Sequence, residues 1–525
     1  MISYDHVIVG SGPAGIAAAL QLEKFNSCIL DVGHEPASIF SNASLSQALH
    51  KGDSNVILGD KWQMLDNLAD PLRYHPKLRA SALQHVMQGE SFNVFGGYGQ
   101  RLICGRGSFA AGGMANAWGA QLLKYTQEDL DEVGDWPIAV TDLSKYYTEL
   151  QDHIGFSGSV DDMNFFLGEA GNLLPPVPLV PVAEYMLTKY ANRFRDIDAK
   201  GLRLGRPRLA VLSKKYQNRP AHDFGEIEFF SPSGAGIYNP LDTLTELRQR
   251  GNINYLAGHK LVSYKEYADY IELEIEVLKT HELIIIRTRH LLLGCGTIQT
   301  SRLVLLKNKQ FGRPLPFVDH PPTLIPIFFP ANFGSPLPKK SYPIQLIGTL
   351  EGFGKRDMMS FYYPGGMLWT DMLLDIPLPL TAARSALAAL IGGMLVVQIW
   401  EESKPIPGNN LSIDNEGKVS ISYPVRRPYS KLSALLASLR GLGGYSYAGL
   451  ASMPPPSWGF HHAATLPMRK LPKKFETHVD GRLWDSRRVR IIDGSVLPSL
   501  PAKNHSFTIM ANASRIADSV KICGY

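Results

Sequence analysis

Residues able to accept a proton or to hydrogen-bond a hydroxyl oxygen lie at two places near the end of the chain. One is the adjacent pair His461 and His462, and the other is the pair Asn504 and His505. An imidazole binds a proton near neutral pH, so a histidine within about 2.6–3.2 Å of a hydroxyl suits general base catalysis. The competing interpretation is structural: the histidines are satisfied core residues, and Asn504 or Ser506 caps the helix predicted to follow.

A glycine-rich turn near the start of the chain predicts a second kind of site. The turn consists of Gly10, Ser11, Gly12, Pro13, Ala14 and Gly15. In such a GxGxxG turn the first glycine permits the sharp bend, the second lets the backbone approach a pyrophosphate, and the third lets helix and strand pack closely. The pyrophosphate then lies at the N-terminus of the following helix, where the amides and the helix dipole favour negative charge.

The elements around the turn support this interpretation. Residues 6–9 predict a buried strand, the residues after the turn predict a helix, and residues 28–31 predict a second buried strand. Asp31 ends that second strand, about 20 residues after the motif begins, where a carboxylate accepts hydrogen bonds from a ribose diol. The sequence therefore predicts a dinucleotide site. The alternative is a structural glycine turn in a plain α/β fold.

The rest of the chain predicts elements of two kinds. Residues 253–294 indicate a small β-meander, because apolar and acidic residues alternate along part of it. Residues 140–155 predict an amphipathic helix capped by Thr141 or Asp142. Frequent prolines between about 315 and 455 predict a second domain inserted into the first, before the strand-then-helix pattern returns at the end.

Together, these segments resemble the glucose–methanol–choline (GMC) oxidoreductase family over nearly the whole chain. Four segments besides the N-terminal turn and Asp31 carry the resemblance: residues 105–119, 296–305, His461-x-x-x-Thr465-x-x-Met468, and 493–495. Members of that family bind FAD and oxidise alcohols. The resemblance implies an α/β protein: a discontinuous Rossmann-type FAD-binding domain with an inserted α+β substrate domain built on an antiparallel sheet.

The resemblance also implies domain boundaries and site residues. We expect the FAD-binding domain in residues 1–160, 201–314 and 456–525, and the substrate domain in residues 161–200 and 315–455. Cofactor contacts beyond the turn and Asp31 are expected from Gly112, Gly113, Asn116, Ala117, Leu261, Asp493 and Gly494. His461 is expected to be the catalytic base, with the adjacent His462 as alternative. Asn504 is expected to bind the substrate oxygen, with His505 as the second candidate.

Departures from the family pattern refine these expectations. The first signature reads Gly-Gly-Met-Ala-Asn-Ala-Trp-Gly over residues 112–119, which is more like the pyranose-oxidase branch and indicates a sugar or glycoside hydroxyl as substrate. Some members of that branch attach FAD to a histidine in this stretch. Ala115 and Ala117 stand at the candidate positions here, so we expect non-covalent FAD. The electron acceptor is expected to be oxygen, a quinone or another carrier.

Composition excludes other classes of function. The net charge of +5 is slight for 525 residues and does not suggest nucleic acid. The four cysteines show no metal-ligand spacing, and reduced thiols suit a cytosolic protein. The apolar run at residues 385–400 is shorter than the roughly 20 residues of a membrane span. No signal peptide precedes the first predicted strand, so a cytoplasmic enzyme without a metal is expected.

Three other functions stay open at this point. A GMC-type hydroxynitrile lyase would keep the fold and the histidine without net redox chemistry. A flavoprotein could act as a binding module, although the presence of both His461 and Asn504 argues against that. An NAD-only dehydrogenase would leave residues 493–495 unexplained.

Overall fold

The structure is a computed structural model with one chain. It describes residues 2–35, 86, 88–99, 101–224, 233–251, 253–336, 338, 340–352, 355–364, 376–424, 428–457 and 459–522.

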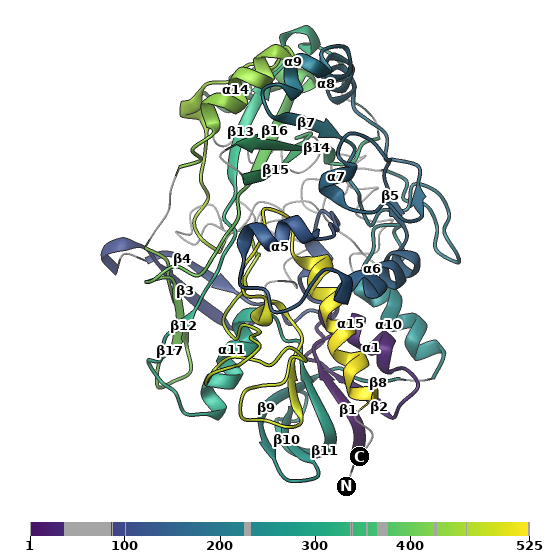
Figure 1. Cartoon of the computed structure of the whole chain (residues 1–525), viewed down its shortest axis with the longest axis vertical. Coiled ribbons are helices and arrows are strands. Elements are labelled where there is room, and N and C mark those ends of the chain that lie inside the picture. Colours follow the sequence, from purple (N-terminus) through teal and green to yellow (C-terminus); the bar gives the residue numbers. More distant parts are fainter. Residues whose placement is uncertain are drawn as a thin grey trace.

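The first half of the architecture, at the bottom of Figure 1, is a sheet built around β1 (Ser3–Val9). β1 pairs in parallel with β2 (Ser27–Leu30) on one side and with β11 (Glu282–Leu293) on the other. β8 (Ile253–Leu256) and β19 (Val489–Ile491) extend the parallel part at either side. All four residues of β2 are buried, as expected for a strand covered on both faces. The predicted βαβ unit is confirmed.

The β-meander is also confirmed. β9 (His259–Glu266), β10 (Ile271–Val277) and the first half of β11 pair antiparallel at the edge of this sheet. Ile271, Leu273 and Ile275 are buried, and the glutamates between them are half-buried. The alternation in the sequence therefore correctly indicates which face of the strand is buried.

Helices cover this sheet and connect the two ends of the chain. α1 (Pro13–Leu22) packs against the last helix, α15 (Ser506–Ile522), and Ser514 Oγ donates to the carbonyl of Ala17 at 3.1 Å. α6 (Thr141–Ile154) packs on α15 and α10 (Pro240–Gln249) on α1.

The predicted cap of α6 is wrong. Val140 occupies the N-cap position and makes no side-chain cap hydrogen bond, while Thr141 and Asp142 lie inside the first turn. The carboxylate of Asp142 instead accepts a hydrogen bond from the backbone N–H of Ala139 at 2.9 Å. The helix thus begins before the polar residues that sequence patterns favour as caps.

The second half, at the top of Figure 1, is an antiparallel sheet covered on its outer side by helices. Its strands are, in order, β13 (Thr323–Phe328), β16 (Met394–Trp400), β15 (Lys355–Tyr362), β14 (Ile344–Gly352) and β7 (Leu202–Gly205). The covering helices are α8 (Pro181–Asn192), α9 (Phe194–Asp198) and α14 (Leu432–Gly441). Both halves of the predicted fold class, the Rossmann-type domain and the inserted α+β domain, are confirmed.

Two strands pair across the expected domain boundaries. β7 falls in residues 201–314, which were assigned to the FAD-binding domain, but it pairs with β14 of the substrate sheet. β17 (Asn410–Ile413) and β18 (Val419–Ser422) fall in the expected substrate domain, but β18 pairs in parallel with β3 (Ser91–Phe95). These strands are only four or five residues long, so their local pattern does not reveal pairing across hundreds of positions. β4 (Arg101–Arg106) and β12 (Leu315–Pro316) complete this third sheet.

The apolar run at residues 385–400 is divided between two elements. It runs from α13 (Leu380–Leu390) into β16, whose residues are mostly buried. No helix in the described ranges has the length and apolar character needed to cross a bilayer. Smaller elements are α5 (Gln127–Val133), α7 (Asn164–Leu167), β5 (Phe156–Ser157) and β6 (Leu173–Leu174).

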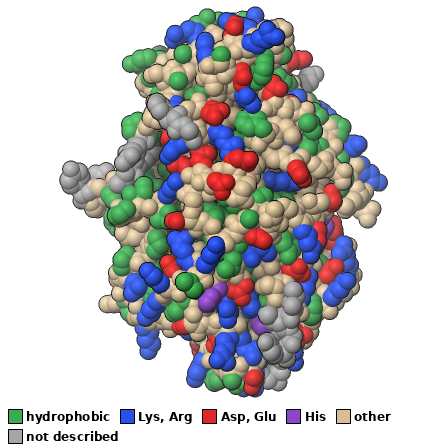
Figure 2. Space-filling view, viewed as in Figure 1, with side chains coloured by type: hydrophobic (Ala, Val, Ile, Leu, Met, Phe, Trp, Pro, Cys, Tyr) green, Lys and Arg blue, Asp and Glu red, His purple; other side chains and the backbone are tan. Residues whose placement is uncertain are grey.

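Charged side chains are mixed on the visible surface. Figure 2 shows Lys and Arg interspersed with Asp and Glu over the face in view. Cys28 is a buried free thiol and Cys295 a partly buried one. Cys523 and the side chain of Cys104 lie outside the described part.

Candidate active site

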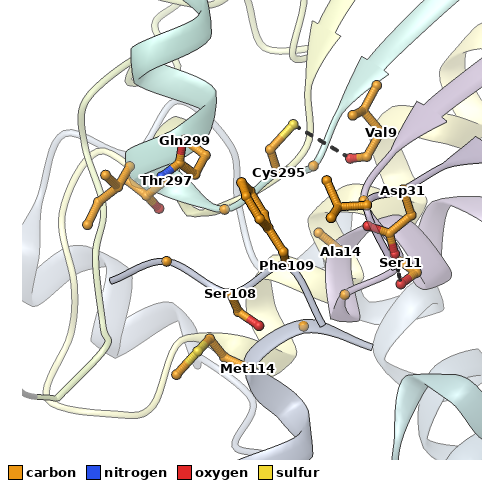
Figure 3. Close-up of a pocket in the computed structure, with 18 of the residues that line it drawn as sticks. Val9, Ser11, Ala14, Asp31, Ser108, Phe109, Met114, Cys295, Thr297 and Gln299 are labelled. Carbon is orange, nitrogen blue, oxygen red and sulfur yellow. Dashed lines mark hydrogen bonds between the residues drawn. The ribbon is translucent and has the colours of Figure 1, made fainter. Parts of the chain in front are cut away.

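A cavity of about 300 Å³ opens where the central parallel strands end. Val9 at the end of β1 and Leu30 at the end of β2 line it, and the loop after β11 closes one side (Figure 3). This is the edge at which open α/β sheets bind ligands. Five parts of the chain that are far apart in sequence contribute walls: residues 9–14, 30–32, 106–114, 259–261 and 294–303, with further contacts from the C-terminal segments.

The glycine-rich turn meets its expected geometry. Gly10 has φ +100°, and a Cβ there would lie 2.7 Å from the carbonyl oxygen of Gly294. A Cβ at Gly15 would lie 1.9 Å from the carbonyl oxygen of Gly10, so α1 packs directly on the end of β1. A Cβ at Gly12 would meet nothing within 4 Å, because Gly12 lines the cavity. Pro13 at the first helical position has no N–H to leave unpaired.

Two helix N-termini point their amides at the same cavity. α1 begins after Gly12 with no side-chain cap hydrogen bond and no acidic residue in its first turn. α11 (Thr297–Lys307) begins after Gly296 in the same uncapped way, with Thr297 and Gln299 on the cavity wall (Figure 3). Such termini bind anions. The Gln299 Nε2 atom is buried and has no hydrogen-bond partner among the described residues, so a ligand acceptor would satisfy it.

Asp31 is the one carboxylate among the described residues that line the cavity. Its Oδ2 accepts from Ser11 Oγ, and from the Tyr255 hydroxyl at 3.4 Å, while the N–H of Gly112 donates to Ser11 Oγ at 2.9 Å. Burial raises the pKa of the Asp31 carboxyl to about 6. Asp31, Ser11 and Gly112 thus join the second strand, the turn and the loop after β4 beside the cavity.

Cationic side chains lie on the wall as well. Arg106, Lys260 and Arg302 line the cavity, and the Lys260 ammonium also lies 2.7 Å from Glu90. Besides Asp31, the wall therefore offers positive charge, uncapped helix ends and an unpartnered amide. This combination suits an elongated ligand with an anionic middle and a hydroxylated part.

Some predicted cofactor residues line the cavity and others act behind it. Gly113, Leu261 and Gly494 are on the wall. Gly112 acts through Ser11. Ala117 is buried outside the wall.

Asn116 and Asp493 have internal partners. Asn116 Nδ2 donates to the carbonyls of Ala111 at 2.7 Å and Gly113 at 2.8 Å, so it braces the loop. Asp493 accepts from Thr300 Oγ1 at 2.5 Å and from the N–H of Ser495 at 3.0 Å. Burial raises the pKa of the Asp493 carboxyl. Asp493 thereby ties α11 to the segment after β19.

Adjacent histidines 461 and 462 point in different directions. His462 lines the cavity, and its Nε2 lies 2.6 Å from Ser457 Oγ. His461 packs away from it, stacked on Trp400 with ring centroids 4.5 Å apart. His505 also lines the cavity, and its ring centroid is 4.8 Å from that of His461. His461 therefore lies one side chain behind the cavity wall, in contact with it.

Burial lowers the pKa of His462 to about 4 and that of His505 to about 3. Positive charge on His320 or His462 also disfavours protonation of His505. Both rings on the wall are therefore neutral imidazoles at neutral pH, and the Nδ1 of His505 is buried with no partner among the described residues.

Asn504 is joined to a residue that the sequence did not indicate. Its Nδ2 donates to Gln121 Oε1 at 3.1 Å, and Gln121 Oε1 also accepts from Ser360 Oγ at 2.9 Å. Ser360 belongs to β15, so Gln121 joins the substrate sheet to the segment before α15. Asn504 Oδ1 and Gln121 Nε2 are both buried without partners among the described residues.

Comparison with known proteins finds a family match at the C-terminal end. Residues 457–513 match the family model described as GMC oxidoreductase, and this match contains His461, Asn504 and His505. This segment is thus similar to the C-terminal part of GMC oxidoreductases. The match supports an FAD-dependent enzyme that acts on CH–OH groups, as the sequence predicted.

Solved structures share the fold of this chain. Pyridoxine 4-oxidase from Mesorbium loti is 12% identical, with a TM-score of 0.61 over 99% of both chains. Formate oxidase is 12% identical, with a TM-score of 0.60 over 100% of this chain and 99% of that one. A formate oxidase variant from Aspergillus oryzae is 13% identical, with a TM-score of 0.60 and the same coverage. No curated protein matches this chain.

The cavity fits FAD. Uncapped amides of α1 and α11 suit the pyrophosphate, and Asp31 suits the ribose diol. The neutral rings of His462 and His505 line the same cavity, together with Ile509. FAD would supply redox chemistry that no side chain can supply.

Two residues of this site, Gln121 and His320, were not predicted from the sequence. Gln121 has no motif of its own, although it follows the first signature by two positions. His320 stands in Asp319-His320-Pro321, outside the segments that carry the family resemblance. His320 is buried, and its Nδ1 lies 3.4 Å from that of His461. No cluster of metal-ligating residues occurs in the part of the chain that the structure describes.

Proposed function

We propose that the enzyme oxidises a sugar or glycoside hydroxyl to a carbonyl, with His461 as the base and FAD held without a covalent bond. The observation that carries the proposal is the packing of His461 against His505, with 4.8 Å between ring centroids, where His505 lines the cavity proposed for FAD. His461 therefore lies next to this cavity without forming its wall. The runner-up base, His462, has its Nε2 engaged with Ser457 at 2.6 Å.

His461 accepts the hydroxyl proton of the substrate. FAD, when bound, supplies the acceptor for the hydride that leaves the carbinol carbon. A neutral imidazole suits the proton transfer because its ordinary pKa lies near the working pH. The lowered pKa values of His462 and His505 keep both neighbours uncharged, so neither repels the imidazolium that forms on His461.

Asn504 and Gln121 hold the substrate oxygen as a coupled pair. In the observed orientation Asn504 presents its Oδ1, which accepts a hydrogen bond from a hydroxyl. If both amides rotate together, Gln121 donates to Asn504 and Asn504 presents Nδ2 to the developing alkoxide. Ser360 can accept as well as donate, so it accommodates both arrangements.

Two features support a polyhydroxylated substrate. Asn504 Oδ1 and Gln121 Nε2 are an acceptor and a donor that lie buried without partners among the described residues, and leaving them unpaired costs about 1–3 kcal/mol each. A sugar offers several hydroxyls that each donate and accept. The first signature, over residues 112–119, resembles that of the pyranose-oxidase branch, which also favours a sugar as substrate.

The structure of the first signature supports non-covalent FAD. Ala115 and Ala117 are buried, with 2% and 3% of their surface exposed, and neither carries an atom that could bond to the flavin. Oxygen is the proposed electron acceptor, since the similar solved structures are named as oxidases. A cytoplasmic location stays a proposal from the cysteine pattern.

Anaerobic flavin reduction tests the proposal. The purified holoenzyme is mixed with a panel of sugars and glycosides without oxygen, and flavin absorbance is followed; at least one of them should bleach it, and air should restore the colour. His461→Ala should slow the reduction by about 10²-fold or more at unchanged flavin content, because it removes the base. His281→Asn is the matched control, since His281 is an exposed residue on the β10–β11 turn.

Two results would contradict this proposal. An unchanged reduction rate in His461→Ala would exclude the base role. Cleavage of a cyanohydrin, together with no bleaching by any sugar or alcohol, would identify the chain as a lyase of the hydroxynitrile type.

A further inference from the structure

A backbone bridge places residues 318–320 beside the histidine pair. The N–H of Val318 donates to the carbonyl of Ala463 at 3.0 Å, and the N–H of Ala463 donates back at 2.8 Å. The next two side chains along the chain lie close to different histidines. Asp319 lies 4.0 Å from the Nε2 of His462, and His320 lies against His461.

The hydrogen on His320 can be assigned from its partner. Its Nε2 contacts the backbone carbonyl oxygen of Glu401, which can only accept a hydrogen bond. The Nε2 atom therefore carries the hydrogen. Burial lowers the pKa of His320 to about 4, so at neutral pH the ring holds this one hydrogen and its Nδ1 has a lone pair.

The tautomer of His461 follows. Its Nδ1 lies 3.4 Å from the Nδ1 of His320. Since that atom of His320 has a lone pair, the hydrogen between the two rings belongs to His461 Nδ1. The lone pair of His461 is then at Nε2, the nitrogen that lies away from His320.

Trp400 packs against both imidazole rings and holds them in this relative orientation. Its ring is stacked on His461 at 4.5 Å with an interplanar angle of 27°, and lies 5.0 Å from His320. Trp400 ends β16 and directly precedes Glu401, whose carbonyl binds His320. The same strand end therefore fixes the orientation of both imidazoles. The 3.4 Å separation is long for a hydrogen bond between neutral groups, and charge on His461 would shorten it.

We propose that His320 is a positioning residue that keeps His461 in the Nδ1–H tautomer, so that Nε2 accepts the substrate proton and His320 stabilises the resulting imidazolium. This inference rests on the proposed function of His461. The O–H bond of the substrate breaks, its proton moves to His461 Nε2, and the lone pair of His320 Nδ1 keeps accepting from His461. No proton or electron crosses between the two rings. The arrangement does for His461 what a buried carboxylate does in a Ser-His-Asp triad, with a neutral group in its place.

Two substitutions separate this role from simple packing. In His320→Asn the amide oxygen lies near the former Nδ1 and still accepts from His461, whereas His320→Leu removes the acceptor at similar volume. We expect His320→Leu to lower kcat by about 10²-fold at a KM within about twofold, and His320→Asn to stay within about tenfold of the native kcat. Flavin content and the visible spectrum should match those of the native holoenzyme in both variants.

The tautomer itself can be measured in the native holoenzyme. Protein labelled with ¹⁵N-histidine should show a His461 signal with hydrogen on Nδ1, assigned by its loss in His461→Ala. This signal decides the question if either His320 variant fails to fold.

The outcomes distinguish this inference from the proposed function. If His320→Leu keeps native kcat while His461→Ala does not, the positioning role is wrong and the base role stands. If His461→Ala is fully active, the proposed function itself fails. Hydrogen on His461 Nε2 in the labelled holoenzyme would also overturn the positioning role.

Discussion

Asp31 is a buried carboxylate with little exposure to water. Ser11 and Tyr255 donate to it, and these bonds favour its charged form, but burial outweighs them and raises its pKa to about 6. The ordinary pKa is 3.8, so burial disfavours the charged form of this carboxyl in the cofactor-free protein. A ribose diol would stabilise the charged form by donating hydrogen bonds.

This shift predicts a pH dependence of stability for the cofactor-free protein. Because the folded pKa is above the unfolded one, the contribution of Asp31 to stability is fully present below about pH 4 and is lost as pH rises through about 6. Asp31→Asn has no such titration. The difference in melting temperature, variant minus native, should therefore become more positive from pH 4 to pH 7. A difference that shrinks over that interval would show that the sign is wrong.

Residue types revealed the site only where a motif surrounds them. Asp31 and the turn could be predicted because spacing and neighbouring strands define their roles. Gln121 and His320 could not, since each acts through a partner more than 100 positions away, Asn504 or His461. Asn116 belongs to the first signature, but its Nδ2 donates to carbonyls of its own loop.

At the level of the element, Gly12 and Gly15 in the turn before α1 are needed for different reasons. Gly15 is needed for packing, since a Cβ there would lie 1.9 Å from the carbonyl of Gly10. Gly12 is needed only for the ligand, since a Cβ there would meet nothing within 4 Å and would point into open space at the cavity.

Substituting alanine for these two glycines should therefore impair different properties, the stability of the protein or its binding of flavin. Gly15→Ala should destabilise the protein by about 1–3 kcal/mol or more through overpacking, seen as a lower melting temperature. Gly12→Ala should leave the free energy of unfolding of the cofactor-free protein within about 1 kcal/mol of native, but reduce the flavin retained after purification. Equal flavin content in Gly12→Ala and native protein would show that the cofactor does not approach this backbone.

Elements with a long regular pattern were predictable and short ones were not. β10 of the meander alternates apolar and acidic residues over its seven positions, so its buried face could be predicted. β7 and β18 have four residues each, and their partners are set by the chain fold. The cap of α6 was missed because Asp142 acts from inside the helix.

For the whole molecule, one buried carboxylate joins the two domains. Asp129 on α5 accepts from the fully buried ammonium of Lys503, next to Asn504, and lies 3.3 Å from Arg356 on β15 of the substrate sheet. Burial lowers the pKa of Lys503, and Asp129 opposes that effect.

Lys503→Met should destabilise the protein by about 3 kcal/mol, because removing one member of a buried ion pair leaves the other without compensation. Thermal unfolding of the holoenzyme measures this loss. Lys279→Met, on an exposed turn, should change stability by less than about 0.5 kcal/mol. If Asp129→Leu added to Lys503→Met restores part of the loss, the cost comes from the stranded charge; a further additive loss would contradict this account.

The packing of α1 on α15 has a consequence for synthesis on the ribosome. Ser514 meets Ala17 across a separation of 497 positions. At about 5–20 residues per second, roughly 25–100 s pass between the emergence of these two helices. During that time the nascent chain presents the alanine-rich face of its first helix without its native cover, which makes it a candidate for chaperone binding until translation is almost finished.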